Sequence, residues 1–204
     1  MAVVEAPRSA EAERVHRRRE EIVTAALDVF TRAGYQGATI EQICAASGAS
    51  VGSVYHHFGG KEQLAAALYV EGLADYQESF RRALRDGKDA EGTIKRIVQN
   101  HLRWVARNPS LAAFLLSTRE AEVAKASNEA LTAMNRQVIA ETRAWVDRHV
   151  AAGAMRPMPT GLFYAVLIGP SQEFARQWVR TRNRRALEEA GRELPEAAWR
   201  AVRA

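Results

Sequence analysis

Residues 39–64, TIEQICAASGASVGSVYHHFGGKEQL, constrain the fold more than any other part of the chain. Thr39 can cap a short helix, and Gln42 stands three residues later, where a capping box places Gln or Glu. Gly48 can take the left-handed conformation that ends a helix. Ser50 can then cap a second helix of about two turns, so the segment predicts a helix-turn-helix.

The second of these helices, expected at residues 51–58, has an inner and an outer face. Val54 and Phe58 are spaced i, i+4 and can pack inward. The side chains left on the outside are Ser53, His56 and His57. Two interpretations stay open on this pattern alone: a structural helical hairpin, or a helix that enters the major groove of DNA.

The sequence around this helix favours one of these two interpretations. Tyr55-His56-His57-Phe58, followed after two residues by Lys61-Glu62, resembles the signature of the TetR family of transcriptional regulators. The resemblance runs from about Arg18 to about Leu68 and includes Ile22–Leu27 upstream. It implies an N-terminal helix-turn-helix domain that binds DNA and a helical C-terminal domain that binds a small molecule.

With the second helix in a groove, its first residues lie nearest the base edges, where glycine permits close approach and serine hydroxyls can bond bases or phosphates. The resemblance implies that Tyr55, His56 and Lys61 face phosphates. Thr39 can reach a phosphate while it caps, and Val51 can touch a thymine methyl group. His57 is either a contact or a turn-stabilising residue. The residues expected to contact DNA are Thr39, Ser50, Val51, Gly52, Ser53, Tyr55, His56, His57 and Lys61.

This segment departs from the family pattern at two places. Many relatives carry a polar or basic residue where this chain has Val51, and a more rigid or polar pair where it has Gly59-Gly60. The two glycines therefore predict a looser link to the helix that Lys61 opens.

Charge supports an anionic partner only locally. The net charge is +5, yet residues 1–60 hold six Arg and seven acidic residues. Arg14, Arg17, Arg18 and Arg19 stand close together, and we expect residues 1–18 to form a flexible basic arm. Such an arm either grips phosphate or the minor groove or is simply the solvated start of a helix.

Several functional classes find no support in the sequence. The five histidines form no H-x-x-x-H pair, so no metal site is predicted, and no cofactor-binding or catalytic motif is present. The single cysteine, Cys44, is expected in the core. No stretch reaches the length of a membrane span and the start of the chain lacks an apolar signal core, so we expect a cytoplasmic protein that is not an enzyme.

Helical periodicity continues along the whole chain and predicts an all-α fold of about nine helices. We expect a DNA-binding domain at residues 19–64 and a larger helical bundle for ligand binding and dimerisation at 65–204. Asn108 can cap the helix that Pro109 opens, and Gly169-Pro170 predicts a kink or break in the last long helix.

The C-terminal domain offers two further sets of candidate residues. The candidate ligand-lining residues are Trp104, Phe114, Met134, Phe163 and Tyr164, although Met and aromatic residues at helical spacing are more often core. Arg119 and Glu120 either orient a polar ligand group or lie on the surface. The candidate dimer residues are Phe174 and Trp178 on the last long helix and Trp199 on a short tail helix, with packing inside the chain as the alternative.

Together these observations predict a dimeric repressor that binds a palindromic double-stranded DNA operator and is released by an unknown small-molecule effector. The alternative is an all-helical interaction module whose helix-turn-helix is structural.

Overall fold

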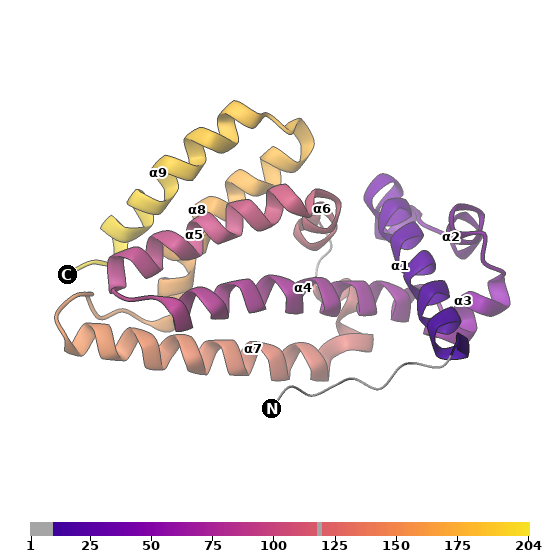
Figure 1. Cartoon of the computed structure of the whole chain (residues 1–204), viewed down its shortest axis with the longest axis horizontal. Helices are drawn as coiled ribbons and strands as arrows, with labels where there is room; N and C mark the ends of the chain where they lie inside the picture. The colour runs from indigo at the N-terminus through magenta and orange to yellow at the C-terminus, as the bar shows by residue number, and fades with distance from the viewer. Residues whose placement is uncertain (1–9, 118–119) are drawn as a thin grey trace.

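The computed structural model describes residues 10–117 and 120–204, and for residues 120–128 it describes the backbone only. The regular secondary structure of these residues is entirely α-helical (Figure 1). These residues form nine α-helices, which confirms the all-α prediction. The helices are α1 (Ala10–Gly37), α2 (Ile40–Ser47), α3 (Val51–Phe58), α4 (Lys61–Asp86), α5 (Ala90–Arg107), α6 (Pro109–Ser117), α7 (Glu120–Ala151), α8 (Thr160–Thr181) and α9 (Arg184–Val202). None of the described helices is long and apolar enough to cross a membrane.

Helices α1–α3 form a small head at one end of the molecule, and α4–α9 form a larger body (Figure 1). In the head, Ile22, Ile43 and Val54 are fully buried and bring one residue from each helix into a common core. Each of the three helices is too short or too polar to be stable alone, so this shared core fixes their relative orientation.

Local capping sets the helix boundaries within the head. The Thr39 hydroxyl accepts a hydrogen bond from the Gln42 amide at 3.3 Å, and the Gln42 side chain accepts one from the Thr39 amide at 2.9 Å. Gly48 ends α2 in the left-handed region, and Ser50 caps α3 through the Ser53 amide at 3.1 Å. The predicted capping box, turn and second cap are all confirmed.

The Gly59-Gly60 link is shaped by its backbone. Gly59 ends α3 at φ 81° and donates its amide to the Tyr55 carbonyl at 2.8 Å. Gly60 lies at φ 143°, a region that is open almost only to glycine. Two residues of positive φ turn the chain sharply into α4, so glycine is a geometric requirement at this corner.

Helix α4 begins at the head and continues along the body, so it connects the two (Figure 1). The predicted boundary between residues 64 and 65 falls inside it. A second connection comes from α6, whose Phe114 is buried in the head core and stacks on Phe30 with ring centroids 5.5 Å apart. The head is therefore held to the body by two helices.

The main core of the body lies among α4, α5, α7, α8 and α9. Its largest fully buried side chains include Ile94, Ile97, Phe163, Leu167 and Met155. We expected a kink, or else a break, at Gly169-Pro170, and helix α8 runs through Pro170 without a break. Helix α9 has 19 residues, much longer than the short tail helix that we predicted, and it contains Pro195.

The junction between α5 and α6 differs from the prediction in its cap. Pro109 opens α6 as expected. Asn108, however, donates both its backbone amide and its side-chain amide to the Trp104 carbonyl, at 2.9 and 3.1 Å. It therefore satisfies the carboxyl end of α5, where unpaired carbonyls need donors, instead of capping α6.

His101 is a buried titratable group between α4 and the rest of the body. It is 4% exposed, and its Nδ1 lies 3.1 Å from the Tyr76 hydroxyl. Its Nε2 has no hydrogen-bond partner among the described residues. Burial lowers the pKa of His101 to about 4, and the nearby Ser171 backbone offsets only part of that effect.

This depressed pKa predicts a loss of stability in mild acid. Between about pH 6.5 and 4 the unfolded chain takes up a proton on His101 that the folded chain does not, so the free energy of unfolding falls as the pH falls. From pH 7 to pH 5 the expected loss is about 2 kcal/mol. His101→Gln keeps a partner for Tyr76 and should remove this part of the pH dependence in urea denaturation. Equal pH slopes for the two proteins would contradict the assignment.

Candidate nucleic-acid interface

The outer face of α3 gathers most of the predicted DNA-contacting residues. Val51 is 46% exposed and Tyr55 is 53% exposed, and the spacing i, i+4 puts them on one stripe. Gly52 and His56 continue the stripe one residue further round the helix, and both are exposed. The opposite face is anchored by Val54 and Phe58, which are buried. The helix therefore presents a fixed, solvent-facing surface.

Gly52 is a position on this surface where no side chain projects. A Cβ atom built at Gly52 would meet nothing closer than the Ser50 hydroxyl oxygen, at 3.9 Å. The protein itself therefore has room for a side chain here, and the absence of one leaves the first turn of α3 open to close approach from outside.

The two histidines at the carboxyl end of α3 sit in different surroundings. Their ring centroids are 5.4 Å apart in an edge-to-face arrangement, with His56 exposed and His57 half-buried. Desolvation lowers the pKa of His57, and the nearby charges of His56, Arg19 and Arg18 lower it further. A neutral His57 suits hydrogen bonding better than charge pairing with phosphate.

Lys61 makes more hydrogen bonds within the protein than the sequence suggested. Its ammonium donates to the carbonyls of Tyr35 at 3.1 Å and Ala38 at 2.9 Å, and lies 4.9 Å from the centroid of the Tyr35 ring. These bonds tie the start of α4 to the end of α1. Because an ammonium has three donors, at most one remains for a phosphate.

Thr39 and the serines also combine capping with exposure. Thr39 and Ser50 are exposed, and Ser53 is half-exposed, but the hydroxyls of Thr39 and Ser50 already accept capping bonds. The Ser50 hydroxyl can still donate its proton outward, whereas the Thr39 hydroxyl also hydrogen-bonds the Glu41 carboxylate and helps to lower its pKa.

The arginines expected in a flexible arm belong to a helix from residue 10 onward. Helix α1 begins at Ala10, so the predicted arm of residues 1–18 is corrected over 10–18, while 1–9 lie outside the described residues. Arg14 pairs with Glu11 and Arg18 with Glu21. Arg19 pairs with Glu71 of α4 and lies 5.3 Å from the centroid of the Phe58 ring. Arg19 thus braces α1, α3 and α4 together.

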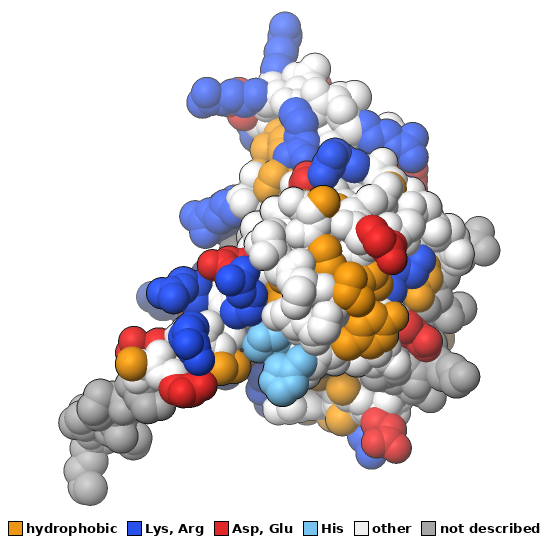
Figure 2. Space-filling model, turned by 90° about the vertical axis from the view of Figure 1, so that its right-hand side faces the viewer, with side chains coloured by type: hydrophobic (Ala, Val, Ile, Leu, Met, Phe, Trp, Pro, Cys, Tyr) orange, Lys and Arg blue, Asp and Glu red, His pale blue; other side chains and the backbone are white. Residues whose placement is uncertain are grey.

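The space-filling view from the head side summarises this face. In Figure 2, histidine side chains lie between a group of intermixed basic and acidic side chains on one side and an apolar patch on the other. The basic side chains of this face can position phosphates only where their acidic partners leave donors free.

Known proteins resemble this chain most clearly over the head. The family model "Bacterial regulatory proteins, tetR family" matches residues 22–68, from the α1 core to the first turns of α4. The HTH-type transcriptional regulator LmrA of Bacillus subtilis is 42% identical over 73 residues, 35% of this chain and 37% of LmrA. The HTH-type transcriptional repressor AcnR of Corynebacterium efficiens is 43% identical over 61 residues, 30% and 32% of the two chains. Residues 22–68 thus match the part of TetR-family proteins that this model describes.

The body of the chain resembles known proteins in its fold. The matched segments span only about a third of the length of LmrA and AcnR. The solved structure of the transcriptional regulator FadR from Bacillus subtilis, in complex with stearoyl-CoA, superposes with a TM-score of 0.72. The two share 18% identity, and the match covers 88% of this chain and 96% of FadR. At that identity the likeness establishes the fold alone.

The body contains a cavity of about 450 Å³ between α4, α7 and α8. Of the predicted ligand residues, Tyr164 lines it. Phe163, buried in the main core, instead borders a second cavity of about 220 Å³, and Met134 is half-buried on α7 outside both linings.

Two other residues predicted to line a ligand pocket are instead used in packing. Trp104 is buried and donates its indole N–H to Asp75 at 2.6 Å, and Phe114 lies in the head core, away from the cavity. The prediction for these two is corrected, because each is used in packing. Arg119 lies outside the described residues, as does the side chain of Glu120.

Most of the cavity lining was not among the residues predicted from the sequence, and it includes Gln77, Asn135, Ile139 and Gln172. The signal that could have found it lies on α8. Gly161, Ala165 and Gly169 follow each other at intervals of four and leave a groove along one side of that helix.

The residues predicted to lie at a dimer interface differ in how deeply they are buried. Trp178 is buried, and its indole donates to the Asn183 carbonyl at 2.9 Å, so it packs within the chain. This corrects its assignment to an interface, because a buried indole with a satisfied N–H has no surface left to offer. Phe174 and Trp199 are half-buried against the body core and keep part of their surface outside.

Proposed function

We propose that this chain is a TetR-family repressor that binds a palindromic DNA operator as a homodimer and is released by a small-molecule effector bound in the body. The observation that carries the proposal is the exposed stripe of α3, held rigidly by a capped turn and a shared core. A chromosomal operator would place this activity in the cytoplasm.

The small size of the α3 surface supports the proposed dimerisation. One two-turn helix with glycine, serine and valine at its start offers few strong base contacts. Two copies related by a twofold axis would contact two half-sites and so add their free energies of binding. Helices α8 and α9, with the exposed parts of Phe174 and Trp199, are the surfaces that we assign to this contact.

The effector site that we assign is the cavity between α4, α7 and α8. FadR of Bacillus subtilis, which has a similar fold, has been solved in complex with stearoyl-CoA, and this supports binding of a small molecule by a protein of this fold. Because α4 runs from the cavity into the head, a molecule that alters the packing of α4 would move α3 as well.

The direct test is a gel shift with the purified protein and the DNA that flanks its own gene. We expect a salt-sensitive shift at a defined sequence. A folded dimer that shifts no sequence would reject the repressor and favour the alternative, an interaction module with a structural helix-turn-helix.

Phosphate contacts can be told from base contacts by Tyr55→Phe. The hydroxyl is exposed and its loss should weaken binding about tenfold, by a similar factor on every operator variant, because phosphates carry no sequence. Lys61→Ala should act uniformly too, with an added loss of stability from the Tyr35 and Ala38 bonds. Fluorescence anisotropy on a panel of operators measures both. A change in the preferred operator would refute the phosphate assignment.

A further inference from the structure

The geometry points to an uncharged, mainly apolar small molecule with a neutral hydrogen-bonding group, such as an alcohol or ketone, as the ligand of the cavity between α4, α7 and α8. This inference rests on the proposed function in taking the cavity as the effector site, and it adds the chemical class of the effector. A volume of about 450 Å³ falls within the range of small-molecule sites.

The greater part of the wall is apolar. Phe80 of α4, Val138 and Ile139 of α7, and Ala165 and Ile168 of α8 contribute hydrocarbon surface from three sides. Ile139 is 45% exposed, unusually high for a large apolar side chain, and lies on this lining. A ligand that covers such surface gains free energy roughly in proportion to the apolar area buried.

The polar part of the wall is neutral. It consists of the amides of Gln77, Asn135 and Gln172 and the hydroxyls of Tyr76 and Tyr164. Among the residues that the structure describes, the lining has no Asp, Glu, Lys or Arg. Neutral donors and acceptors suit a hydroxyl or carbonyl oxygen of a ligand. Such an oxygen accepts hydrogen bonds and needs no opposite charge beside it.

Some of these polar groups are already paired, and others keep free capacity. Gln77 donates to the Asn135 side chain at 2.8 Å, which links α4 to α7. Tyr164 donates to the Thr142 hydroxyl at 2.7 Å. The Asn135 amide nitrogen is a donor and the Tyr164 oxygen an acceptor that those two bonds leave available to a ligand.

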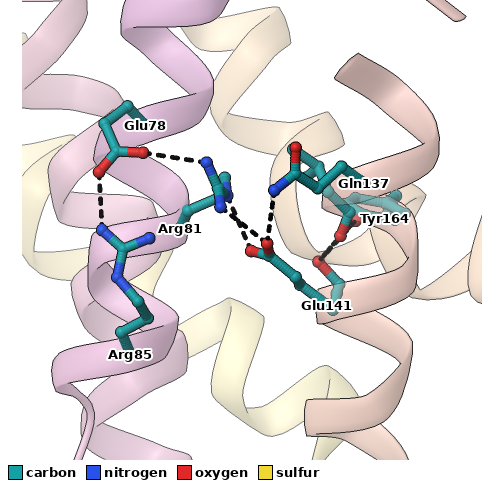
Figure 3. A network of polar contacts seen from close by, with 8 residues as sticks. Glu78, Arg81, Arg85, Gln137, Glu141 and Tyr164 are labelled. Atoms are coloured by element: carbon teal, nitrogen blue, oxygen red, sulfur yellow. Dashed lines mark hydrogen bonds and ion pairs between the residues drawn. The ribbon is translucent and has the colours of Figure 1, made fainter. Parts of the chain in front are cut away.

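Charged side chains one turn from the lining on α4 are paired with other charged side chains. Arg81 follows Gln77 by one turn of α4, and Figure 3 shows its guanidinium meeting Glu141 of α7 through two parallel hydrogen bonds, at 2.8 and 2.7 Å. Arg85 and Arg81 also share Glu78 (Figure 3). A second anion would have to displace Glu141 from a bidentate pair, which is the strongest geometry for Arg.

An anionic ligand is therefore disfavoured at this cavity. Its charge would lose water and gain no cation, whereas a neutral ligand of equal length loses little. Chain length and apolar area being equal, the difference in affinity reports the charge alone.

The test compares 1-octanol with octanoate at pH 7.5 by isothermal titration calorimetry on the full chain. We expect 1-octanol to bind at least tenfold more tightly than octanoate. Tighter or equal binding of octanoate would overturn the inference, and so would the failure of 1-octanol to bind.

A variant locates the binding at this cavity. Ile139→Arg puts a cation on the lining at a position exposed enough to accept it, and should shift the ratio of affinities at least tenfold toward octanoate. Ala144→Arg places the same charge on an exposed position of α7 away from the lining and should leave the ratio unchanged. An unchanged ratio in Ile139→Arg would overturn the placement.

The outcome is independent of DNA binding. Binding of 1-octanol by a protein that shifts no DNA would leave the cavity inference standing and reject the repressor. A sequence-specific DNA shift by a protein that ignores 1-octanol would do the reverse.

Discussion

Gly52→Glu is expected to weaken operator binding by about 100-fold while leaving the fold intact. The nearest atom to a Cβ at this position is 3.9 Å away, so the protein accommodates the new side chain. On the DNA side the same side chain blocks the close approach of the first turn of α3. It also brings a carboxylate toward the phosphates, and like charges brought together at an interface cost several kcal/mol.

Two further variants isolate the cause of that loss. Ala144→Glu makes the same change in net charge on an exposed position of α7 and should bind DNA nearly as well as the native protein. Gly52→Ala should fall between the native protein and Gly52→Glu, because it adds bulk without charge. Anisotropy titrations give the affinities and thermal melts verify the fold. Native affinity in a folded Gly52→Glu protein would show that α3 does not face DNA.

Gly87→Ala is expected to give the largest loss of stability from a single methyl group. A Cβ at Gly87 would overlap the Thr93 side chain, lying 2.9 Å from its Cβ and 3.0 Å from its Cγ2. Thr93 cannot turn aside, because it is fully buried and its hydroxyl donates to the Asp89 carbonyl at 2.6 Å. Overpacking of this kind costs about 3 kcal/mol, or a fall in melting temperature of roughly 6–12 °C.

The matched control is Gly191→Ala on α9, where a Cβ would meet nothing within 4 Å. The same substitution there should stabilise the protein by about 0.5–1 kcal/mol, because glycine inside a helix costs more conformational entropy than alanine. Urea denaturation measures both free energies of unfolding. A Gly87→Ala protein as stable as the native one would mean that the turn between α4 and α5 is packed differently.

The parts of the fold that the sequence predicted are those fixed by neighbouring residues. Thr39 and Gln42 form the capping box because both bonds lie within one turn of chain. Val54 and Phe58 are buried because their spacing matches the helical repeat. Interactions of this range depend little on the rest of the molecule, so a pattern suffices to predict them.

The errors involve partners that are distant in the sequence. The ammonium of Lys61 contacts residues more than twenty positions earlier, and Arg19 reaches Glu71 on α4. Phe114 looked available from the sequence, yet it is covered by the helices of the head. Trp178 is covered both by other helices and by the local residues Arg182 and Asn183. The cavity is likewise made by three helices, so its lining follows from packing that no single stripe reveals.

Hydroxyl-radical footprinting of the DNA upstream of the gene tests most directly whether two copies of this chain bind an operator through α3. We predict two protected patches on twofold-related sequences, with centres about 10 bp or a multiple of that apart. Protection that is uniform along the DNA, or a single patch without a symmetric mate, would contradict the account.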